Sequence, residues 1–230
     1  MEQKSQEDTS GDDSTLTGTT YPHFEPDLFR RNDEGSDHLF YEQARLVNHI
    51  DDAAIGALRN FYKSQLPEKG HILDLMSSWV SHLPESADVL YSEVTGLGLN
   101  ETELSKNPVL TSWDVHDLNS DFVLPYADQT FNGAIVSVSV QYLIKPVEIF
   151  ADVGRVLKPG SPFAVTFSNR MFPTKAVAIW QVLSDLQRAD LLRAYFRLTG
   201  VFGEAQFHDL SPAPGRSDPL FAVVAKKGET

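Results

Sequence analysis

Apolar residues along the chain form two kinds of pattern: short runs that are mostly apolar, and longer stretches with near-helical spacing. The short runs have the length of strands that are covered on both faces of a sheet. They lie at residues 71–75, 89–94, 109–113, 134–140 and 163–167. Residues 205–210 and 220–226 predict two more strands, which form an antiparallel pair at the sheet edge.

The longer stretches predict helices. Residues 38–66 carry apolar side chains at near-helical spacing, and Asp51 and Asp52 mark a candidate break between two helices there. Shorter helices are expected at residues 101–106 and 146–156. A long helical region is predicted at residues 172–198, and Gly200 ends it, because glycine readily adopts the backbone conformation that terminates helices.

The order of these elements predicts an α/β fold. Residues 124–169 contain a strand, a helix, the turn Lys158-Pro159-Gly160 and a second strand, which together form one βαβ unit. A βαβ unit joins parallel strands and places its helix on the sheet face. We therefore expect a mostly parallel sheet with helices on its faces, and 230 residues are enough for one such domain with a core.

Composition narrows the possible functions. The formal net charge is −13, and an acidic surface repels phosphate, which disfavours nucleic acids and anionic membranes as partners. The chain has no cysteine, which excludes disulfides, thiolate metal sites and cysteine nucleophiles. No apolar run reaches the ~20 residues of a membrane span. The first 20 residues are polar and acidic and lack an apolar signal segment, so we expect a cytoplasmic protein with a disordered tail.

The segment LPYADQTFNGAIVSVSVQYL and the turn RVLKPGS closely resemble the second half of class I S-adenosylmethionine-dependent methyltransferases. The resemblance covers roughly residues 70–227. It implies a Rossmann-like, doubly wound sheet of seven mostly parallel strands with a terminal antiparallel strand. Residues 1–20 are then the acidic tail, 21–69 an N-terminal helical cap, and 70–227 the methyltransferase-like domain, with S-adenosyl-L-methionine as cofactor.

The loop after the first strand departs from the pattern of this family. It reads Asp74-Leu75-Met76-Ser77-Ser78-Trp79, and Asp74 matches the family's acidic position. Met76 and Ser78 stand where the family has glycines, which permit positive φ and close backbone approach. The resemblance assigns residues 74–78 to cofactor binding, with a serine hydroxyl available to the methionine carboxylate.

The resemblance also assigns residues after the second and third strands. The family's ribose-binding acid falls on Gly98 here, so Asn100 or Glu101 is expected to reach the ribose instead, although Glu101 fits a first-turn helix charge equally well. Asp117 and Leu118 match the adenine-binding position best, with Asp114 as the alternative. Either aspartate also fits a turn cap.

The acceptor side of the predicted site follows the fourth and fifth strands. Ser139, Gln141 and Tyr142 are expected at the floor of the site, and Arg170 could recognise an acidic acceptor. A general base assists transfer to an oxygen or nitrogen acceptor by removing its proton. The candidates are His116, Tyr142, His82 and His38. Trp79, Tyr126 and Tyr142 are candidates for contacts with the sulfonium, although each also fits core or rim packing.

These patterns favour an S-adenosylmethionine-dependent methyltransferase with a small-molecule acceptor. Its predicted catalytic residues are His116 and Tyr142, and no metal site is predicted. The altered cofactor loop leaves a non-catalytic partner or regulator with the same fold as the alternative. A nicotinamide-dependent oxidoreductase would need GxGxxG after the first strand, where this chain has DLMSSW. The oligomeric state and the acceptor atom stay open.

Overall fold

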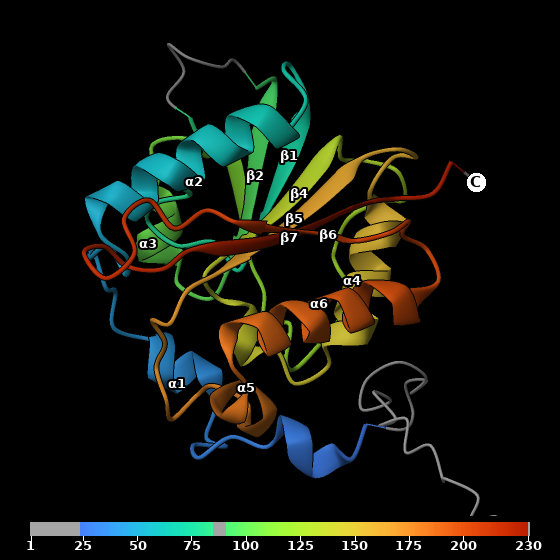
Figure 1. Cartoon of the computed structure of the whole chain (residues 1–230). Coiled ribbons are helices and arrows are strands. Elements are labelled where there is room, and N and C mark those ends of the chain that lie inside the picture. Colours follow the sequence, from blue (N-terminus) through green and yellow to red (C-terminus); the bar gives the residue numbers. More distant parts are fainter. Residues whose placement is uncertain (1–23, 85–90, 230) are drawn as a thin grey trace, which may run out of the picture.

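The computed structural model describes residues 24–84 and 91–229. Its centre is one seven-stranded sheet in the order β3-β2-β1-β4-β5-β7-β6 (Figure 1). The strands are β1 (His71–Leu75), β2 (Glu93–Gly98), β3 (Ser112–Val115), β4 (Gly133–Ser137), β5 (Pro162–Phe167), β6 (Gln206–Asp209) and β7 (Phe221–Lys226). The first five run parallel, and β7 pairs antiparallel with both β5 and β6. The predicted fold class and the terminal antiparallel pair are confirmed.

Helices cover both faces of the sheet (Figure 1). On one face, α2 (Asp52–Gln65) packs its buried side chains with strand residues such as Ile72, Ile135 and Ala164. On the other, α4 (Pro146–Val156) and α6 (Asp185–Thr199) pack with Leu73, Val136 and other residues of the same strands. The buried side chains of α2 pack directly on the sheet. This helix is therefore a layer of the domain, although its residues lie within the predicted 21–69 cap.

Shorter helices complete the described chain. They are η1 (Pro26–Phe29), α1 (Asp37–Tyr41), α3 (Glu101–Lys106), η2 (Val140–Tyr142) and α5 (Ala178–Val182). The predictions at 101–106 and 146–156 are confirmed by α3 and α4. Of the described helices, none is long and apolar enough to cross a bilayer. The predicted tail at residues 1–20 lies outside the described residues.

Two predicted helical regions are interrupted. Residues 42–51 form no helix, so the region at 38–66 consists of α1 and α2, with the carboxylate of Asp51 capping α2 by accepting from the backbone N–H of Ala54 at 2.9 Å. The region at 172–198 divides into α5 and α6 because Ser184 and Gln187 form a capping box that starts α6. Gly200 ends α6 with φ +69°, as predicted.

The second and third strands begin three or four residues later than predicted, and β4 ends at Ser137 instead of residue 140. Gly96 and Gly98 lie inside β2, beyond residue 94, where the predicted strand ended. A Cβ at Gly96 would displace the side chain of Leu110, so packing favours glycine here. A glycine in a strand can mark close approach of a neighbour, and apolar periodicity alone does not reveal it.

Candidate functional site

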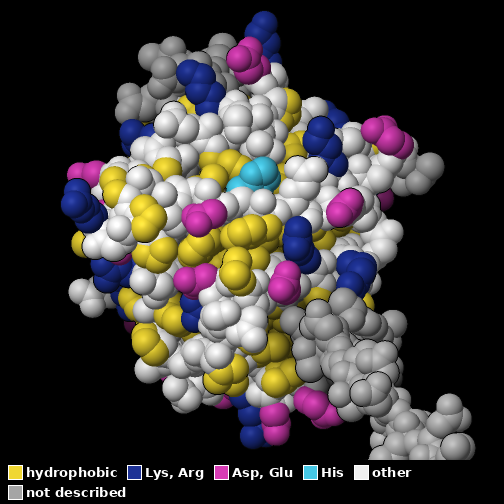
Figure 2. Space-filling model, viewed as in Figure 1, with side chains coloured by type: hydrophobic (Ala, Val, Ile, Leu, Met, Phe, Trp, Pro, Cys, Tyr) yellow, Lys and Arg dark blue, Asp and Glu magenta, His cyan; other side chains and the backbone are white. Residues whose placement is uncertain are grey.

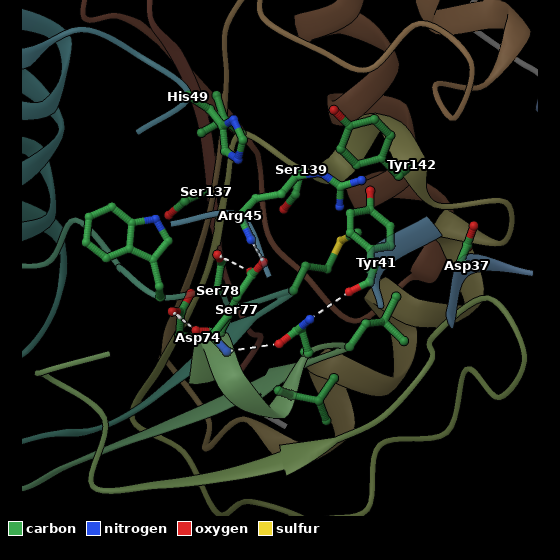
Figure 3. Close-up of a pocket in the computed structure, with 18 of the residues that line it drawn as sticks. Asp37, Tyr41, Arg45, His49, Asp74, Ser77, Ser78, Ser137, Ser139 and Tyr142 are labelled. Carbon is green, nitrogen blue, oxygen red and sulfur yellow. Dashed lines mark hydrogen bonds between the residues drawn. The ribbon is translucent and has the colours of Figure 1, made fainter. Parts of the chain in front are cut away.

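A cavity of about 300 Å³ lies where the carboxyl ends of β1, β2, β3 and β4 meet (Figure 3). This is where open α/β sheets bind ligands. The predicted site residues that line it are Asp74, Met76, Ser77, Ser78, Asn100, His116, Asp117, Leu118, Ser139 and Tyr142. Leu75 is fully buried in the core and does not line the cavity. Gln141, Glu101 and Asp114 are likewise not among the residues that line it.

The loop after β1 has a residue in a backbone conformation that favours glycine, although that residue is Met76. Met76 has φ +57°, in the left-handed region, which costs a non-glycine residue roughly 1–2 kcal/mol. The next residue, Ser77, donates its backbone N–H to the carbonyl of Leu97 at 2.8 Å. Its own carbonyl occupies the space that a Cβ at Gly98 would need. Position 98 therefore cannot carry an acidic side chain while the loop keeps this path.

Hydrogen bonds from serine hydroxyls and from an asparagine amide hold this loop in place. Ser77 Oγ donates to Asp74 Oδ2 at 2.5 Å, and Ser78 Oγ donates to Glu103 Oε2 at 2.5 Å (Figure 3). The amide of Asn107 donates to the carbonyl of Ser78 and to Ser81 Oγ, both at 2.9 Å. Residues 77–84 form no helix, so these bonds hold the loop in place of a helix start.

Asp74 is the buried carboxyl at the base of this loop. It is 2% exposed, and burial raises its pKa to about 7, while hydrogen bonds from Ser77 and Ser81 act in the opposite direction. Asp74 is therefore partly protonated at neutral pH. A carboxyl in this state can donate a hydrogen bond as well as accept one.

A segment that we call the strap, residues 41–49, contributes Tyr41, Arg45, Val47 and His49 to the lining of the cavity. Asn100 caps α3 by accepting from the N–H of Glu103 and donates to the carbonyls of Tyr41 at 2.7 Å and Glu42 at 3.1 Å. Glu103 accepts the backbone N–H of Arg45 at 2.6 Å. The amide of Asn100, predicted to reach a ribose, thus attaches the strap. Asn100 is 59 positions from Tyr41 in the sequence, so the sequence pattern did not predict this contact.

Trp79 is a further attachment point of the strap. Its Nε1–H donates to the carbonyl of Val47 at 3.1 Å. The predicted sulfonium contact of Trp79 stays a prediction, since this residue does line the cavity. Tyr126 and His38 are not among the residues that line it.

The loop after β3 places Asp117 and Leu118 on the cavity wall. The carboxylate of Asp117 accepts from the N–H of Asn119 at 3.0 Å and from Ser120 Oγ at 2.7 Å, so it is a turn cap as well. Asn119 Nδ2 donates to Asp37 Oδ2 and to the carbonyl of Tyr142, each at 2.9 Å. Asn119, which the sequence did not single out, thereby connects three segments of the wall.

The two predicted catalytic residues are already engaged. Tyr142 Oη accepts the N–H of Phe172 at 2.8 Å, and burial raises its pKa, so it stays protonated at neutral pH. His116 Nε2 lies 2.7 Å from the carbonyl oxygen of Asp121, which can only accept, so Nε2 carries the proton. Nδ1 of His116 is then the nitrogen that can take up a proton, whereas Tyr142 is poorly suited to act as a base.

Two other histidines line the cavity, His49 and His82. Burial lowers the pKa of both, that of His82 to about 4, so both are neutral at neutral pH. His82 is 7% exposed, and its Nδ1 is buried without a hydrogen-bond partner among the described residues. His49, on the strap, packs edge-on against Phe172. The sequence offered no signal for His49, because only the fold brings the strap here.

Backbone strain gathers at this cavity. Met76, His82 and Val138 line it, and each has positive φ without being glycine. A β-branched residue such as Val138, with φ +48°, is especially unfavourable in this region. Strain of this kind is typical of ligand sites, where the surrounding structure holds it.

Arg170 also lines the cavity, but its charge is compensated. Its Nε and Nη2 both lie 2.8 Å from Asp218 Oδ1. The predicted recognition of an acidic acceptor by Arg170 would therefore require breaking this pair. Among the described residues, no group of three or more metal-ligating side chains is present.

No protein-family model matches the chain. Residues of this chain are 30% identical over 110 positions to "Methyltransferase phqN" of Penicillium fellutanum, covering 45% of this chain and 34% of that protein. They are 38% identical over 55 positions to "Biotin biosynthesis bifunctional protein BioHC" of Teredinibacter turnerae, covering 24% of this chain and 9% of that protein. The matched residues thus span about a third of one of these curated relatives and less than a tenth of the other.

Solved structures match over most of the fold. An S-adenosylmethionine-dependent methyltransferase from Mesorhizobium loti has a TM-score of 0.54 and 18% identity, covering 76% of this chain and 98% of that one. The (4+2)-cyclase SpnF has a TM-score of 0.56 and 15% identity, covering 75% and 81%. The resemblance to class I methyltransferases is confirmed for the fold. The cyclase shows that related folds also serve other reactions.

Proposed function

We propose that this protein is an S-adenosylmethionine-dependent methyltransferase that acts on a small-molecule acceptor. One observation carries the proposal: the loops after β1, β2, β3 and β4 meet in a single cavity of about 300 Å³. That volume is at the lower end of the range for small-molecule sites. Asp117 and Leu118 line it after β3, and Ser139 lines it after β4, in the order that the resemblance requires.

The residues of the cavity fit such a cofactor chemically. Ser139 Oγ lines it and is buried without a partner among the residues described, and an orphaned buried hydroxyl calls for a ligand or water. Asp117 would accept the adenine amino group, and the loop at residues 76–78 would hold the methionine part. When bound, the sulfonium supplies an electrophilic methyl group, and the protein mainly orients the reactants and excludes water.

The strap supports a small acceptor. It is hydrogen-bonded to α3 and to Trp79, so its lining residues form a fixed wall that bounds the volume available to an acceptor. On the face of the molecule that Figure 2 shows, basic side chains are interspersed with acidic ones, without a continuous basic patch. Together with the net charge of −13, this supports an acceptor other than a nucleic acid.

Neutral imidazoles are available to take a proton from an oxygen or nitrogen acceptor. His49 and His82 both line the cavity, and burial lowers the pKa of each. His49 is thus added to His116 and His82, which were candidates from the sequence. Tyr142 would contribute packing and its backbone carbonyl instead of proton transfer, because its hydroxyl stays protonated.

Calorimetric titration with S-adenosylhomocysteine tests the proposal. We expect saturable binding at micromolar to millimolar ligand and an increase in melting temperature, since a ligand that binds only the folded state stabilises it. Asp117→Ala should weaken binding roughly tenfold, because it removes about one charge-assisted hydrogen bond to the ligand. Absence of heat and of thermal shift at millimolar ligand would contradict a methyltransferase and favour the non-catalytic alternative.

A further inference from the structure

The cavity contains one cation whose guanidinium is not neutralised by a carboxylate among the described residues. Arg45 lies on the strap and lines the cavity, and in Figure 3 its side chain extends across it toward Tyr41 and Tyr142. Nη2 donates to the carbonyl of Phe40 at 2.8 Å. Nη1 is buried and has no hydrogen-bond partner within the described chain. A buried, unpaired charged donor is costly unless something pairs with it.

Aromatic rings hold this guanidinium in position. Its Cζ lies 4.7 Å from the ring centroid of Phe40, 5.4 Å from that of Phe172 and 5.6 Å from that of Tyr41. Rings of this kind favour a cation over their faces and restrict its orientation. The planar fork of Arg45 is therefore preorganised, with Nη1 left as a donor.

The other charges of the cavity are already compensated or bound elsewhere. Asp37 pairs with Arg31 at 2.8 Å and with Lys175 at 3.0 Å. Arg170 pairs with Asp218. Glu103 accepts the backbone N–H of Arg45, not its guanidinium. Arg45 thus stands out in a chain with net charge −13, where acidic partners are abundant.

We infer that Arg45 binds the carboxylate of a ligand in this cavity. A guanidinium binds a carboxylate through parallel hydrogen bonds, and Nη1 is the donor that is free to form one. The inference rests on the proposed function for the identity of the ligand. Two carboxylates are then possible, that of the methionine part of the methyl donor and that of an acidic acceptor. No helix begins at residues 77–84 to present its N-terminus to the first one, so Arg45 would supply the positive charge that the loop at residues 76–78 lacks.

The test compares two adenosyl thioethers by calorimetry. S-adenosylhomocysteine carries the amino acid tail, and 5′-methylthioadenosine lacks it. Both are titrated into the full chain and into Arg45→Gln, Arg45→Lys and the control Arg30→Gln, which changes an exposed ion pair with Asp27. The nitrogen-15 NMR signal of the Arg45 Nε–Hε group is then followed as benzoate, a simple carboxylate, is added to protein saturated with S-adenosylhomocysteine.

Two results support the inference and identify the source of the carboxylate. If Arg45 binds the donor's tail, Arg45→Gln weakens S-adenosylhomocysteine roughly 10- to 100-fold and leaves 5′-methylthioadenosine unchanged. If it binds the acceptor, both thioethers keep their affinities, and benzoate shifts the Arg45 signal. Arg45→Lys should recover only part of either effect, because it keeps the charge and loses the fork.

The overturning result is equally specific. If Arg45→Gln changes neither thioether and benzoate does not move the Arg45 signal, the inference is wrong. If neither thioether binds the unaltered protein, the proposed function fails, and benzoate is titrated into the ligand-free protein instead. A shift of the Arg45 signal there supports carboxylate binding without a methyl donor, and an unmoved signal overturns it. The ratio of the two thioether affinities within one variant is insensitive to partial misfolding.

Discussion

The carbonyl oxygen of Ser77 packs against the backbone of Gly98, in the space that any side chain at position 98 would need. Ser77 follows β1 and Gly98 is the last residue of β2, and the N–H of Ser77 donates to the carbonyl of Leu97. The path of the loop at residues 76–78 therefore requires a residue without a side chain at position 98. This relationship explains why the acid expected at position 98 is missing.

Gly98→Asp, which introduces the acid expected from the methyltransferase resemblance, should destabilise the protein by about 3 kcal/mol, because overpacking is combined with a carboxylate next to a carbonyl oxygen. Urea unfolding monitored by tryptophan fluorescence measures the change. Gly98→Ala should have a smaller effect of the same sign. A Gly98→Asp protein that is as stable as the parent and binds S-adenosylhomocysteine more tightly would show that the loop can move away.

Met76→Val should destabilise the fold by about 2 kcal/mol, since β-branched residues tolerate positive φ poorly. Met76 has φ +57°. Met76→Gly is the matched comparison: it removes the left-handed strain of about 1 kcal/mol but also removes side-chain contacts, so its net change should be below 1 kcal/mol. Equal destabilisation by both substitutions would mean that lost side-chain packing, and not backbone conformation, determines the change in stability.

Asp74→Asn should change how stability depends on pH. The pKa of Asp74 rises from 3.8 in the unfolded chain to about 7 in the folded protein, so between these values the folded state holds a proton that the unfolded chain has released. Stability from this group is complete below pH 4 and is lost as pH rises through 7. The melting temperature of Asp74→Asn relative to the parent should therefore be higher at pH 8 than at pH 5.

His82 acts in part of the same pH range with the opposite sign. Its pKa falls from 6.5 to about 4 in the folded state, so its contribution is present above pH 6.5 and is lost as pH falls toward 4. Comparing the double variant Asp74→Asn, His82→Gln with Asp74→Asn alone isolates the contribution of His82 to the pH dependence of stability. If the difference between Asp74→Asn and the parent does not depend on pH, the carboxyl of Asp74 has an ordinary pKa.

Lys175→Met should destabilise the protein by about 3 kcal/mol, because removing one member of a buried ion cluster leaves its partners uncompensated. Lys175 is fully buried, lies 3.0 Å from Asp37 and donates to the carbonyl of Gly35 at 2.7 Å. Thermal unfolding measures the loss. Arg30→Gln, at an exposed pair, should change stability by less than 1 kcal/mol and serves as the control.

The sequence was sufficient for the fold but only partly for the site. Residues 134–167 predicted their strands and helix because short-range apolar pattern and turn chemistry dominate there. Asp117 and Ser139 were found because they directly follow strands. The contact of Asn100 with the strap, and the roles of Arg45 and Glu103, were not predicted for a common reason. Their partners are distant in sequence, 58 positions apart for the N–H of Arg45 and Glu103, and periodicity contains no information about such contacts.

The four hydrogen bonds that attach the strap use only its backbone, namely the carbonyls of Tyr41, Glu42 and Val47 and the N–H of Arg45. These four attachments therefore do not depend on the identity of the strap side chains. Substitutions at Arg45 or His49 remove ring contacts with Phe172 but leave the four hydrogen bonds in place. The strap is for this reason a suitable position for a library of variants aimed at changing which ligand the cavity binds.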